Sequence, residues 1–554
     1  MEQLTQKKID HKHVWRLYEQ GISYKTTIHL YDNVKLNQNF YLGRQWEGVN
    51  APDIEKPVVN IIRQAVDYFV SMMVSDDIGV QTILPEDTPE EVRQAIEYIV
   101  SNEIDKIMEQ VHYKSKLRKS VKNCALDGDT FVYHRWSSEL NKESEYVGGV
   151  DVELLDNTNV IFCNPTQMDV QKQDSIIIIK KLPVKQLRKM ARENGLDESM
   201  ITEDTDDYNQ AEVDARAVEK YGTLLTYFWK ENGDVYAIQT VKNGVIKKPL
   251  NTTLKYFPIA NFSWRVRKDS YHGESPVTSV RQNQIMINKY YMMLNEFIKK
   301  LAFPKLLYDQ TKIARWTNKV EAIAVNGDPN LAFVMQSPSM QLSNQVIEYI
   351  NDLITKTKET LGVFDVALGN VQPDNTSAII ALQKTASQPL ELQKMDFYQM
   401  IEDSIRIMLD IMSKFYGVRR IPIKVPPNEA QMILLPQGTD EITAYIDFNY
   451  ADISPEKILL HIDIGASAYW SELMQVQTLD NMFRAGIIPN AKTYVEQLPD
   501  GLIKSKKDIL KAIEEEEAKQ MQQQMMGSME QSQPLGQSAS NLKTGDTIAN
   551  KLKR

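Results

Sequence analysis

The chain has 554 residues, of which 42% are hydrophobic and 25% are charged. This composition is typical of a folded protein, and the length is enough for three or four domains. Its 64 Lys and Arg against 74 Asp and Glu give a formal charge of −10. No pronounced basic tract occurs, which argues against a protein that encloses DNA and binds it sequence-specifically. Cys124 and Cys163 are the only cysteines, too few for a disulfide framework, so we expect a reducing compartment.

Neither a signal peptide nor a membrane helix is expected. The first fifteen residues, MEQLTQKKIDHKHVW, contain no apolar core of the kind that a secretory signal requires. The longest apolar runs, such as IIII at 176–179, are far shorter than the ~20 residues that cross a bilayer.

Helices are predicted for the first part of the chain. Apolar residues at helical spacing over 11–40 predict one helix, which the glycines of YLGRQWEG at 41–48 end. The segment 58–74 follows Pro57 and is apolar on most sides, which is typical of a buried helix. A third helix is expected from Thr88-Pro89 to about Val111.

Strands are predicted next. Short β-branched or aromatic segments separated by Asn, Asp and Pro occupy 129–136, 150–156, 159–165 and 174–182. Asn232-Gly233 and Asn243-Gly244 lie between apolar strands over 222–248, which predicts a three-stranded meander. The acidic segment 201–214 is interpreted as a solvated loop rather than a cation site, because its carboxylates lack EF-hand spacing.

The clearest helix signal lies at 275–302. Ser275 is a favourable N-cap, Pro276 suits the first helical position, and Phe303-Pro304 ends a helix of roughly 25 residues. One stripe of this helix is apolar, and amides occupy much of the rest. These amides, which suggest packing against polar neighbours, are Gln282, Asn283, Gln284, Asn288 and Asn295.

A small insert and a second helix follow. The insert, 305–340, holds KLLYDQ, Trp316, a turn at 326–329 and the strand NLAFVMQ. Apolar spacings of three and four over 342–361 predict a helix similar in length to the first, so we expect an antiparallel pair. The loop LGNVQPDNTS, 368–377, lies at the other end of that pair and contains no Lys or Arg.

Beyond the loop, a long helix with Pro389 inside it is expected to kink at that residue. Strands return at 421–425 and 443–450, and a helical section spans 467–525. Residues 526–554 are rich in Ser, Gln, Gly and Asn, which is typical of a disordered tail.

Motifs for catalysis are missing. The sequence has no GxxxxGK[ST], Rossmann glycine run, HExxH or GxSxG. The histidines are scattered, and isolated histidines are usually structural, so we expect no metal centre and no cofactor. They are His11, His13, His29, His112, His134, His272 and His461. Asp127 and Asp129 in LDGDTF favour a tight turn over an acid pair.

The order of many modest motifs resembles the portal proteins of tailed bacteriophages. The motifs span about residues 20–500, and one departure from the pattern is Asn164, where related chains often have an acidic residue. They are YLGRQW (41–46), the buried helix with NII and AVD (60–67), LDGDTFVYHRW (126–136), NVIFCNP (159–165), HGESPVTSVRQNQIMIN (272–288), the kinked helix and AGIIPNAKTYVEQLP (485–499).

The resemblance implies an α+β, mostly helical portal-type subunit with a β-rich wing and clip. The implied parts are wing (1–274), stem helix 1 (275–302), clip (303–340), stem helix 2 (341–363), tunnel loop (364–376), long kinked helix (377–417), further wing strands (418–466), crown (467–525) and tail (526–554). Portals form closed rings, typically of twelve subunits, at one capsid vertex, and are not enzymes. Double-stranded DNA passes through the ring while a separate terminase hydrolyses ATP.

Partners and site residues follow from the same resemblance. The expected partners are other copies of the chain, DNA bound without sequence specificity, terminase, the head-completion or tail adaptor, and the major capsid and scaffolding proteins. The expected location is the virion vertex, and the host cytoplasm during assembly. The expected site residues are Asn370, Val371, Gln372, Pro373 and Asp374 facing DNA, Lys312, Arg315, Trp316 and Lys319 at the clip interface, and Tyr291, Ile298, Val346 and Leu353 in stem packing.

Three alternatives are compatible with the sequence. Trp316 could form the core of the small insert instead of an interface. The loop at 368–377 could be a hinge between helices instead of a DNA contact. Without the resemblance, the chain would be a soluble α+β scaffold protein or an uncharacterised nucleic-acid-processing enzyme.

Overall fold

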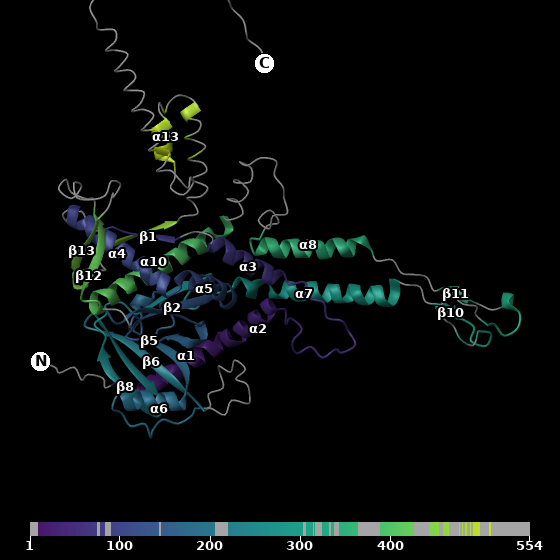
Figure 1. Ribbon diagram of the computed structural model, residues 1–554. Coiled ribbons are helices and arrows are strands. Elements are labelled where there is room, and N and C mark those ends of the chain that lie inside the picture. The colour runs from purple at the N-terminus through teal and green to yellow at the C-terminus, as the bar shows by residue number, and fades with distance from the viewer. Residues whose placement is uncertain are drawn as a thin grey trace, which may run out of the picture. The chain divides into compact units, whose positions relative to one another are not determined.

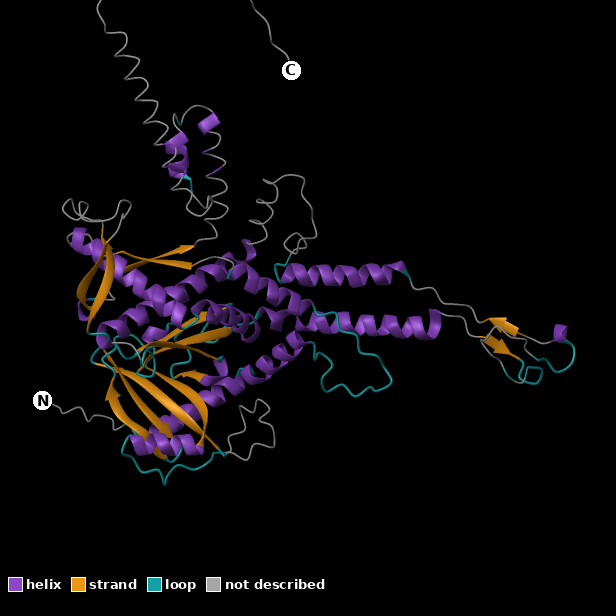
Figure 2. Cartoon of the chain, in the orientation of Figure 1, coloured by secondary structure: helices purple, strands orange, loops and turns teal. Residues whose placement is uncertain are grey.

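The computed structural model describes most of the first 464 residues and parts of the remainder. The described residues are 9–74, 78–83, 90–142, 146–204, 220–302, 306–313, 315, 324–331, 334–336, 343–363, 388–425, 442–453 and 458–464, with short pieces between 476 and 513. The chain divides into two compact units, Met1–Ile464 and Gly465–Arg554. Figures 1 and 2 show the helices and strands of both.

The first predicted helix is in fact two. α1 (His11–Thr27) begins at Asp10, whose side chain accepts from the His13 N–H. His29 then adopts a left-handed conformation with φ 55°, and α2 (Leu30–Leu42) follows. The prediction of one helix was wrong because apolar periodicity continues across a single residue that breaks the backbone hydrogen bonds. Gly43, with φ 83°, ends α2 as expected.

Three more helices complete the N-terminal part. They are α3 (Ile61–Met73), α4 (Glu90–Gln110) and α5 (Tyr113–Asp127). The sequence predicted α3 and α4 but missed α5, which has five basic residues and few apolar ones. Its buried side, which includes Leu117, Val121 and Cys124, packs against α3 and β2, so tertiary contacts determine this helix.

Two antiparallel sheets form the centre of the first unit. The three-stranded sheet has the order β3-β2-β9, and the five-stranded sheet β4-β5-β6-β7-β8. The strands are β2 (Asp129–Ser137), β3 (Gly149–Leu155), β4 (Val160–Phe162), β5 (Ser175–Pro183), β6 (Tyr221–Glu231), β7 (Asp234–Val241), β8 (Gly244–Asn251) and β9 (Ile259–Ser263). The meander predicted for 222–248 is confirmed as β6-β7-β8. α6 (Val184–Glu193), which covers part of this sheet, was not predicted.

The predicted helix pair is present. α7 (Pro276–Phe297) continues through a π-helical turn, Ile298–Ala302, and α8 (Asn344–Thr360) returns beside it (Figure 1). The helices are antiparallel, because α3 contacts both of them and the chain reverses between them. The intervening insert contributes a hairpin of β10 (Leu306–Tyr308) and β11 (Val334–Gln336).

The long kinked helix is only partly confirmed. Gln388–Leu390 forms a 3-10 turn, and α10 (Glu391–Phe415) starts directly after it. Pro389 therefore lies at the helix start, where its missing N–H costs nothing, rather than at a kink inside the described helix. Residues 377–387 lie outside the described part.

The remaining strands form two antiparallel pairs, one between strands that are consecutive in the chain and one between strands far apart in it. β12 (Val418–Val425) pairs with β13 (Ile442–Asn449), and β1 (Ile78–Ile83) pairs with β14 (Leu459–Ile464). In the second unit, α13 (Ala491–Gln497) is described, but most of the predicted helical section 467–525 and the whole tail are not.

Two amide side chains of α7, Gln284 and Asn288, form hydrogen bonds to the backbone where the chain enters α3. The amide-rich sequence of this helix predicted such packing against polar neighbours. Gln284 is fully buried; its Oε1 accepts from the Ile61 N–H at 3.1 Å and its Nε2 donates to the Val59 carbonyl at 2.6 Å. Asn288 Oδ1 accepts from the Val59 N–H at 3.2 Å. These bonds fix α7 against the entry to α3.

We expect Gln284→Leu to lower the free energy of unfolding by about 1–3 kcal/mol, because it leaves a buried N–H and a buried carbonyl without partners. Urea unfolding followed by tryptophan fluorescence measures the change. The matched control is Gln282→Leu at an exposed position of the same helix, which should change stability by less than about 0.5 kcal/mol. Equal effects of the two variants would contradict this account of Gln284.

Candidate functional site

The start of α7 is bound directly to the end of α5. The Ser275 hydroxyl accepts from the Val277 N–H at 3.1 Å and donates to the Ala125 carbonyl at 2.7 Å. It therefore caps α7 and satisfies a carbonyl in the last turn of α5. This is the point at which the long helix pair leaves the sheet-containing body, so we consider it the candidate functional site.

Two glycines let the backbones cross here. Gly128 has φ +97°, and a Cβ on it would lie 2.7 Å from the Gly273 carbonyl oxygen. A Cβ on Gly273 would lie 2.4 Å from the Gly128 carbonyl oxygen. Because backbone atoms cannot rotate away as side chains can, both positions require glycine. The glycines of LDGD and HGES, far apart in sequence, thus meet at one crossing.

A buried Asp and His lie beside the crossing. Asp129 and His272 have fully buried side chains, with Oδ2 and Nδ1 2.6 Å apart. Burial lowers the pKa of His272 more than the Asp129 carboxylate raises it, so the imidazole is neutral and donates its Nδ1–H to that carboxylate. Asn157 donates to the other oxygen of Asp129 at 2.6 Å and to the Asp127 carbonyl at 2.9 Å. The carboxylate is held by donors on both oxygens.

Lys25 brings α1 to the same cluster. Its fully buried Nζ lies 2.6, 3.1 and 2.5 Å from the carbonyl oxygens of Asn157, Thr158 and Val160. Burial lowers the pKa of Lys25 to about 7, while the charge of Asp129 raises it. Three acceptors match the three N–H groups of an ammonium, whereas a neutral amine has only two, so the geometry favours the charged form.

The turn predicted at Asp127 and Asp129 is confirmed. The two carboxyl groups are buried, so they do not form an acid pair that a substrate could reach. Gly128 ends α5 and β2 begins at Asp129. Burial, followed by the charges of Asp156 and Asp129, raises the pKa of Asp127 to about 8. Asp127 is therefore protonated at pH 7, while Asp129 is engaged by His272 and Asn157. The cluster positions α1, α5, β2 and α7 rather than a reacting molecule.

The four predicted stem residues lie on the helix pair. Tyr291 and Ile298 belong to α7 and its π-helical turn, and Val346 and Leu353 to α8. Tyr291 and Leu353 are half-buried, while Ile298 is 43% and Val346 42% exposed. Sequence reasoning missed the aromatic contact between the helices, an edge-on pair of Tyr290 and Tyr349 with centroids 5.7 Å apart.

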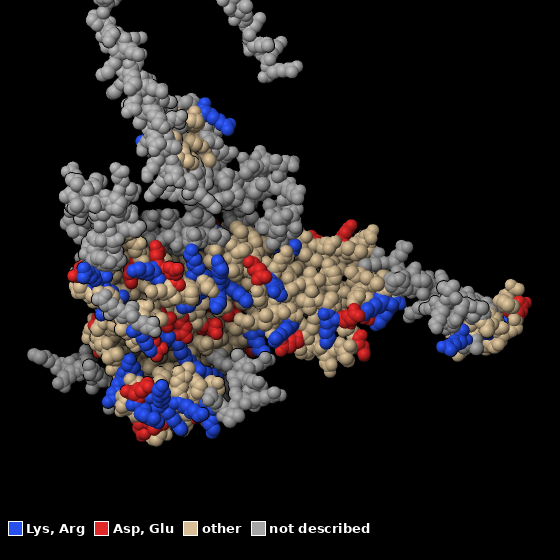
Figure 3. Space-filling model, viewed as in Figure 1, with Lys and Arg blue, Asp and Glu red and all other residues tan. Residues whose placement is uncertain are grey.

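The helix pair exposes further apolar side chains. They are Met286, Met293, Ile347 and Tyr349, each at least 39% exposed. Figure 3 shows a mainly uncharged surface over α7 and α8, with charges gathered toward one edge. An exposed apolar strip of this kind on a long helix pair is typical of a surface that another protein covers.

The other predicted site residues are only partly described. Lys312 and Arg315 are described, and the Lys312 N–H donates to the Asp309 carbonyl in a turn after β10. Trp316, Lys319 and the loop residues Asn370, Val371, Gln372, Pro373 and Asp374 lie outside the described residues. Their predicted roles therefore stay predictions.

The described residues contain neither a candidate metal cluster nor a membrane-spanning helix. Among them, no group of three or more His, Cys, Asp or Glu side chains is arranged to hold a metal ion. None of the helices in the described part is long and apolar enough to cross a bilayer.

We expect Asp129→Asn to lower the free energy of unfolding by about 3 kcal/mol at pH 7, because it removes the charged partner of a buried network that includes Lys25 and His272. Urea unfolding at fixed pH measures this loss. A change below about 0.5 kcal/mol would show that the cluster is not a stabilising junction.

Asp127→Asn is the matched control, two residues away in the same turn. The folded pKa of Asp127, about 8, lies above the ordinary aspartate value of 3.8. Folding therefore requires proton uptake, and the wild type loses stability as the pH rises from about 4 to 8. An amide needs no proton, so Asp127→Asn should keep or raise stability at pH 7, and its advantage should grow between pH 6 and 8.

The phage P22-like portal protein family matches residues 127–423, more than half of the chain. The matched region begins at the Asp127 turn and includes the glycine crossing, the helix pair and α10. No curated protein matches the chain. The chain therefore belongs to the P22-like phage portal protein family, whose members are structural, capsid-associated oligomeric connectors.

Proposed function

We propose that copies of this chain close into a ring, typically of twelve, at one capsid vertex, and that double-stranded DNA enters and leaves the capsid through the ring. The observation that carries this proposal, beside the family match, is the antiparallel pair of α7 and α8 with its exposed apolar side chains. A closed ring needs heterologous contacts, in which each subunit offers two different surfaces to two neighbours. A helix pair that projects apolar groups suits that requirement.

The charge of the chain suits a DNA channel. Each phosphate that a protein neutralises adds salt-dependent affinity, which would resist sliding. The net charge is −10, and the loop 368–377 contains no Lys or Arg. A channel with such loops would contact DNA weakly, without sequence specificity, and allow it to move.

Further partners belong to the same proposal. The insert between α7 and α8 would bind the terminase during packaging and the head-completion or tail adaptor afterwards, with Lys312, Arg315, Trp316 and Lys319 as anchors. Basic and aromatic residues are common at such interfaces. The body outside the helix pair would meet the major capsid and scaffolding proteins. Assembly would take place in the host cytoplasm, and ATP hydrolysis would belong to the terminase.

Ile298→Asp should give folded protein that does not close rings, because it places a charge in the apolar contact between neighbouring helix pairs. Light scattering after size-exclusion chromatography, with negative-stain microscopy, measures ring formation. Leu250→Asp is a control of similar chemistry at a 50% exposed position on the edge strand β8, and it should form rings as the wild type does. Intact rings of Ile298→Asp would remove this position from the interface, and a wild-type protein that stays monomeric or dimeric under all conditions would contradict the proposed ring.

Replacing Asn370 to Asp374 by a short glycine bridge should leave ring formation unchanged, because the free energy of loop closure depends weakly on length. We expect the defect during DNA handling, as incomplete packaging or loss of packaged DNA after the terminase leaves. Genome length and retention in purified particles measure it. Normal packaging and retention would support the hinge interpretation and remove the loop from the DNA path.

A further inference from the structure

One side of α10 is not covered by any of the residues that the structure describes. Five residues at spacings of three and four form a continuous stripe on this helix: Leu392, Met395, Asp396, Gln399 and Asp403. Leu392 is 72% and Met395 61% exposed, which is unusual for large apolar side chains beside one another. The opposite side of the helix, which includes Phe397 and Ile401, is buried. We call this set the α10 stripe.

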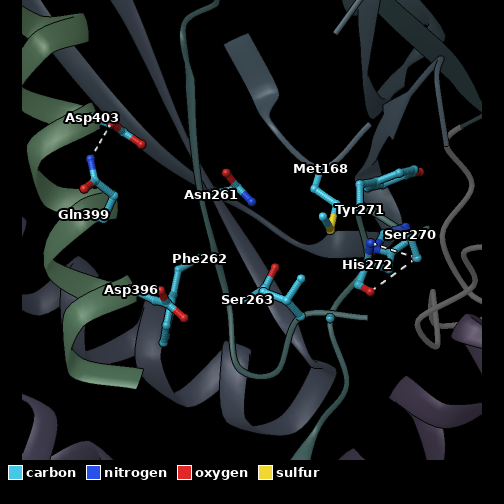
Figure 4. A pocket seen from close by; sticks show the side chains of 12 residues that line it. Met168, Asn261, Phe262, Ser263, Ser270, Tyr271, His272, Asp396, Gln399 and Asp403 are labelled. Atoms are coloured by element: carbon cyan, nitrogen blue, oxygen red, sulfur yellow. Dashed lines mark hydrogen bonds between the residues drawn. The ribbon is translucent and has the colours of Figure 1, made fainter. Parts of the chain in front are cut away.

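The α10 stripe borders a hollow of about 160 Å³. Asp396, Gln399 and Asp403 line one wall, and Asn261 and Ser263 of β9 lie across from them (Figure 4). Met168 and Val266, 45% and 62% exposed, complete an apolar rim. The hollow thus combines carboxylates with exposed apolar surface, as a site for a long basic side chain would.

The carboxylates of the hollow lack an ion-pair partner among the described residues, and the nearby Arg406 is paired with Glu402. Neither Asp396 nor Asp403 forms an ion pair within the described part of the chain, and Asp403 accepts only an amide hydrogen bond, from Gln399 at 3.1 Å. Burial raises the pKa of both groups. Arg406 offsets only part of the effect on Asp403; a cation in direct contact with the carboxylates would oppose it further, because it stabilises the charged form.

α5 presents the complementary surface. Its exposed side carries Ser115, Arg118, Lys119 and Lys122, again at spacings of three and four. We call this set the α5 stripe. Among the described residues, none of its three cations has an acidic partner, and Lys122 instead lies over the Tyr41 ring at 4.5 Å. The long stems of Arg and Lys can cover apolar groups such as Leu392 while their charged ends reach carboxylates.

The two stripes cannot meet within one chain. α5 and α10 touch through Ser120 Oγ and Met400 Sδ, 3.8 Å apart. At 100° per residue, Ser120 lies roughly 150° around α5 from the centre of the α5 stripe. The α5 stripe therefore faces away from α10 of its own chain, and a partner for either stripe must come from elsewhere.

We infer that the α10 stripe of one subunit binds the α5 stripe of the next subunit. This inference rests on the proposed ring, and it names a second contact besides the α7 and α8 helices. The occupant is a second copy of this chain, because one molecule carries both unlike charged surfaces, as a heterologous contact that repeats around a ring requires. Opposite charges at such a contact select the correct partner surface and register.

Charge reversal tests the contact. At near-neutral pH and about physiological salt, Asp396→Lys with Asp403→Lys should raise the protein concentration needed for half-maximal ring assembly by about tenfold, because like charges would then face each other. Arg118→Glu with Lys119→Glu should act similarly. Combining all four substitutions should return the midpoint to within about threefold of the wild-type value.

The control pair is Glu231→Lys with Lys247→Glu, two exposed charges on the five-stranded sheet, which should shift the midpoint less than twofold. Thermal unfolding of each variant shows that it is folded. A wild-type ring that tolerates both reversals, or a combined variant that is not restored, would overturn this inference and leave the ring itself intact. A wild type that never forms rings would overturn both proposals.

Cross-linking tests the identity of the occupant. Ser115→Cys and Gln399→Cys, made in separate chains and mixed, should give covalent dimers with a short bis-maleimide only when both variants are present. Each variant alone is the control, because it also contains the native Cys124 and Cys163. If another segment of the same chain covers the α10 stripe instead, the mixture will give no more dimer than the single variants, and the inference is wrong.

Discussion

The backbone crossing of Gly128 and Gly273 is the constraint on which the rest of the structure depends. It allows the end of α5, the start of β2 and the segment before α7 to approach more closely than any side chain would permit. Asp129 and His272, the residues adjacent to the two glycines, are therefore brought within 2.6 Å in a fully buried environment. Ser275, two residues after Gly273, donates a hydrogen bond to a carbonyl in the last turn of α5. The direction in which α7 leaves the body follows from these contacts.

The two charged groups beside the crossing are costly to bury, and both are held by several hydrogen-bond partners. Lys25 is surrounded by three carbonyls and Asp129 by two donors, so each charge has the partners that replace water. Such a network tolerates few alternative arrangements, since a lost partner leaves a buried charge unpaired. In a ring through which we propose that DNA moves, a junction with one allowed geometry would keep the helix pair aligned with the sheets.

The proposed contacts between copies divide into two kinds. The helix pair offers mainly apolar surface, which supplies affinity without direction. The α5 and α10 stripes offer opposite charges, which supply register and selectivity. A ring that used only the first could close with the wrong number of subunits or in a shifted register. The two surfaces together would define one rotation between neighbours.

The sequence by itself determined the helix pair, the β6-β7-β8 meander and the turn at Asp127, because Ser-Pro starts, Asn-Gly turns and apolar periodicity act over a few residues. It did not reveal the break at His29, the helix α5, or the start of α10 at Glu391. Those depend on packing: α5 has few apolar residues and is stabilised by α3 and β2. The junction was equally hidden, since Lys25, Asn157 and His272 lie on separate segments with no shared local pattern. Motif order identified the family, but only the tertiary structure showed why LDGD and HGES both contain glycine: a Cβ on either residue would clash with the backbone carbonyl of the other.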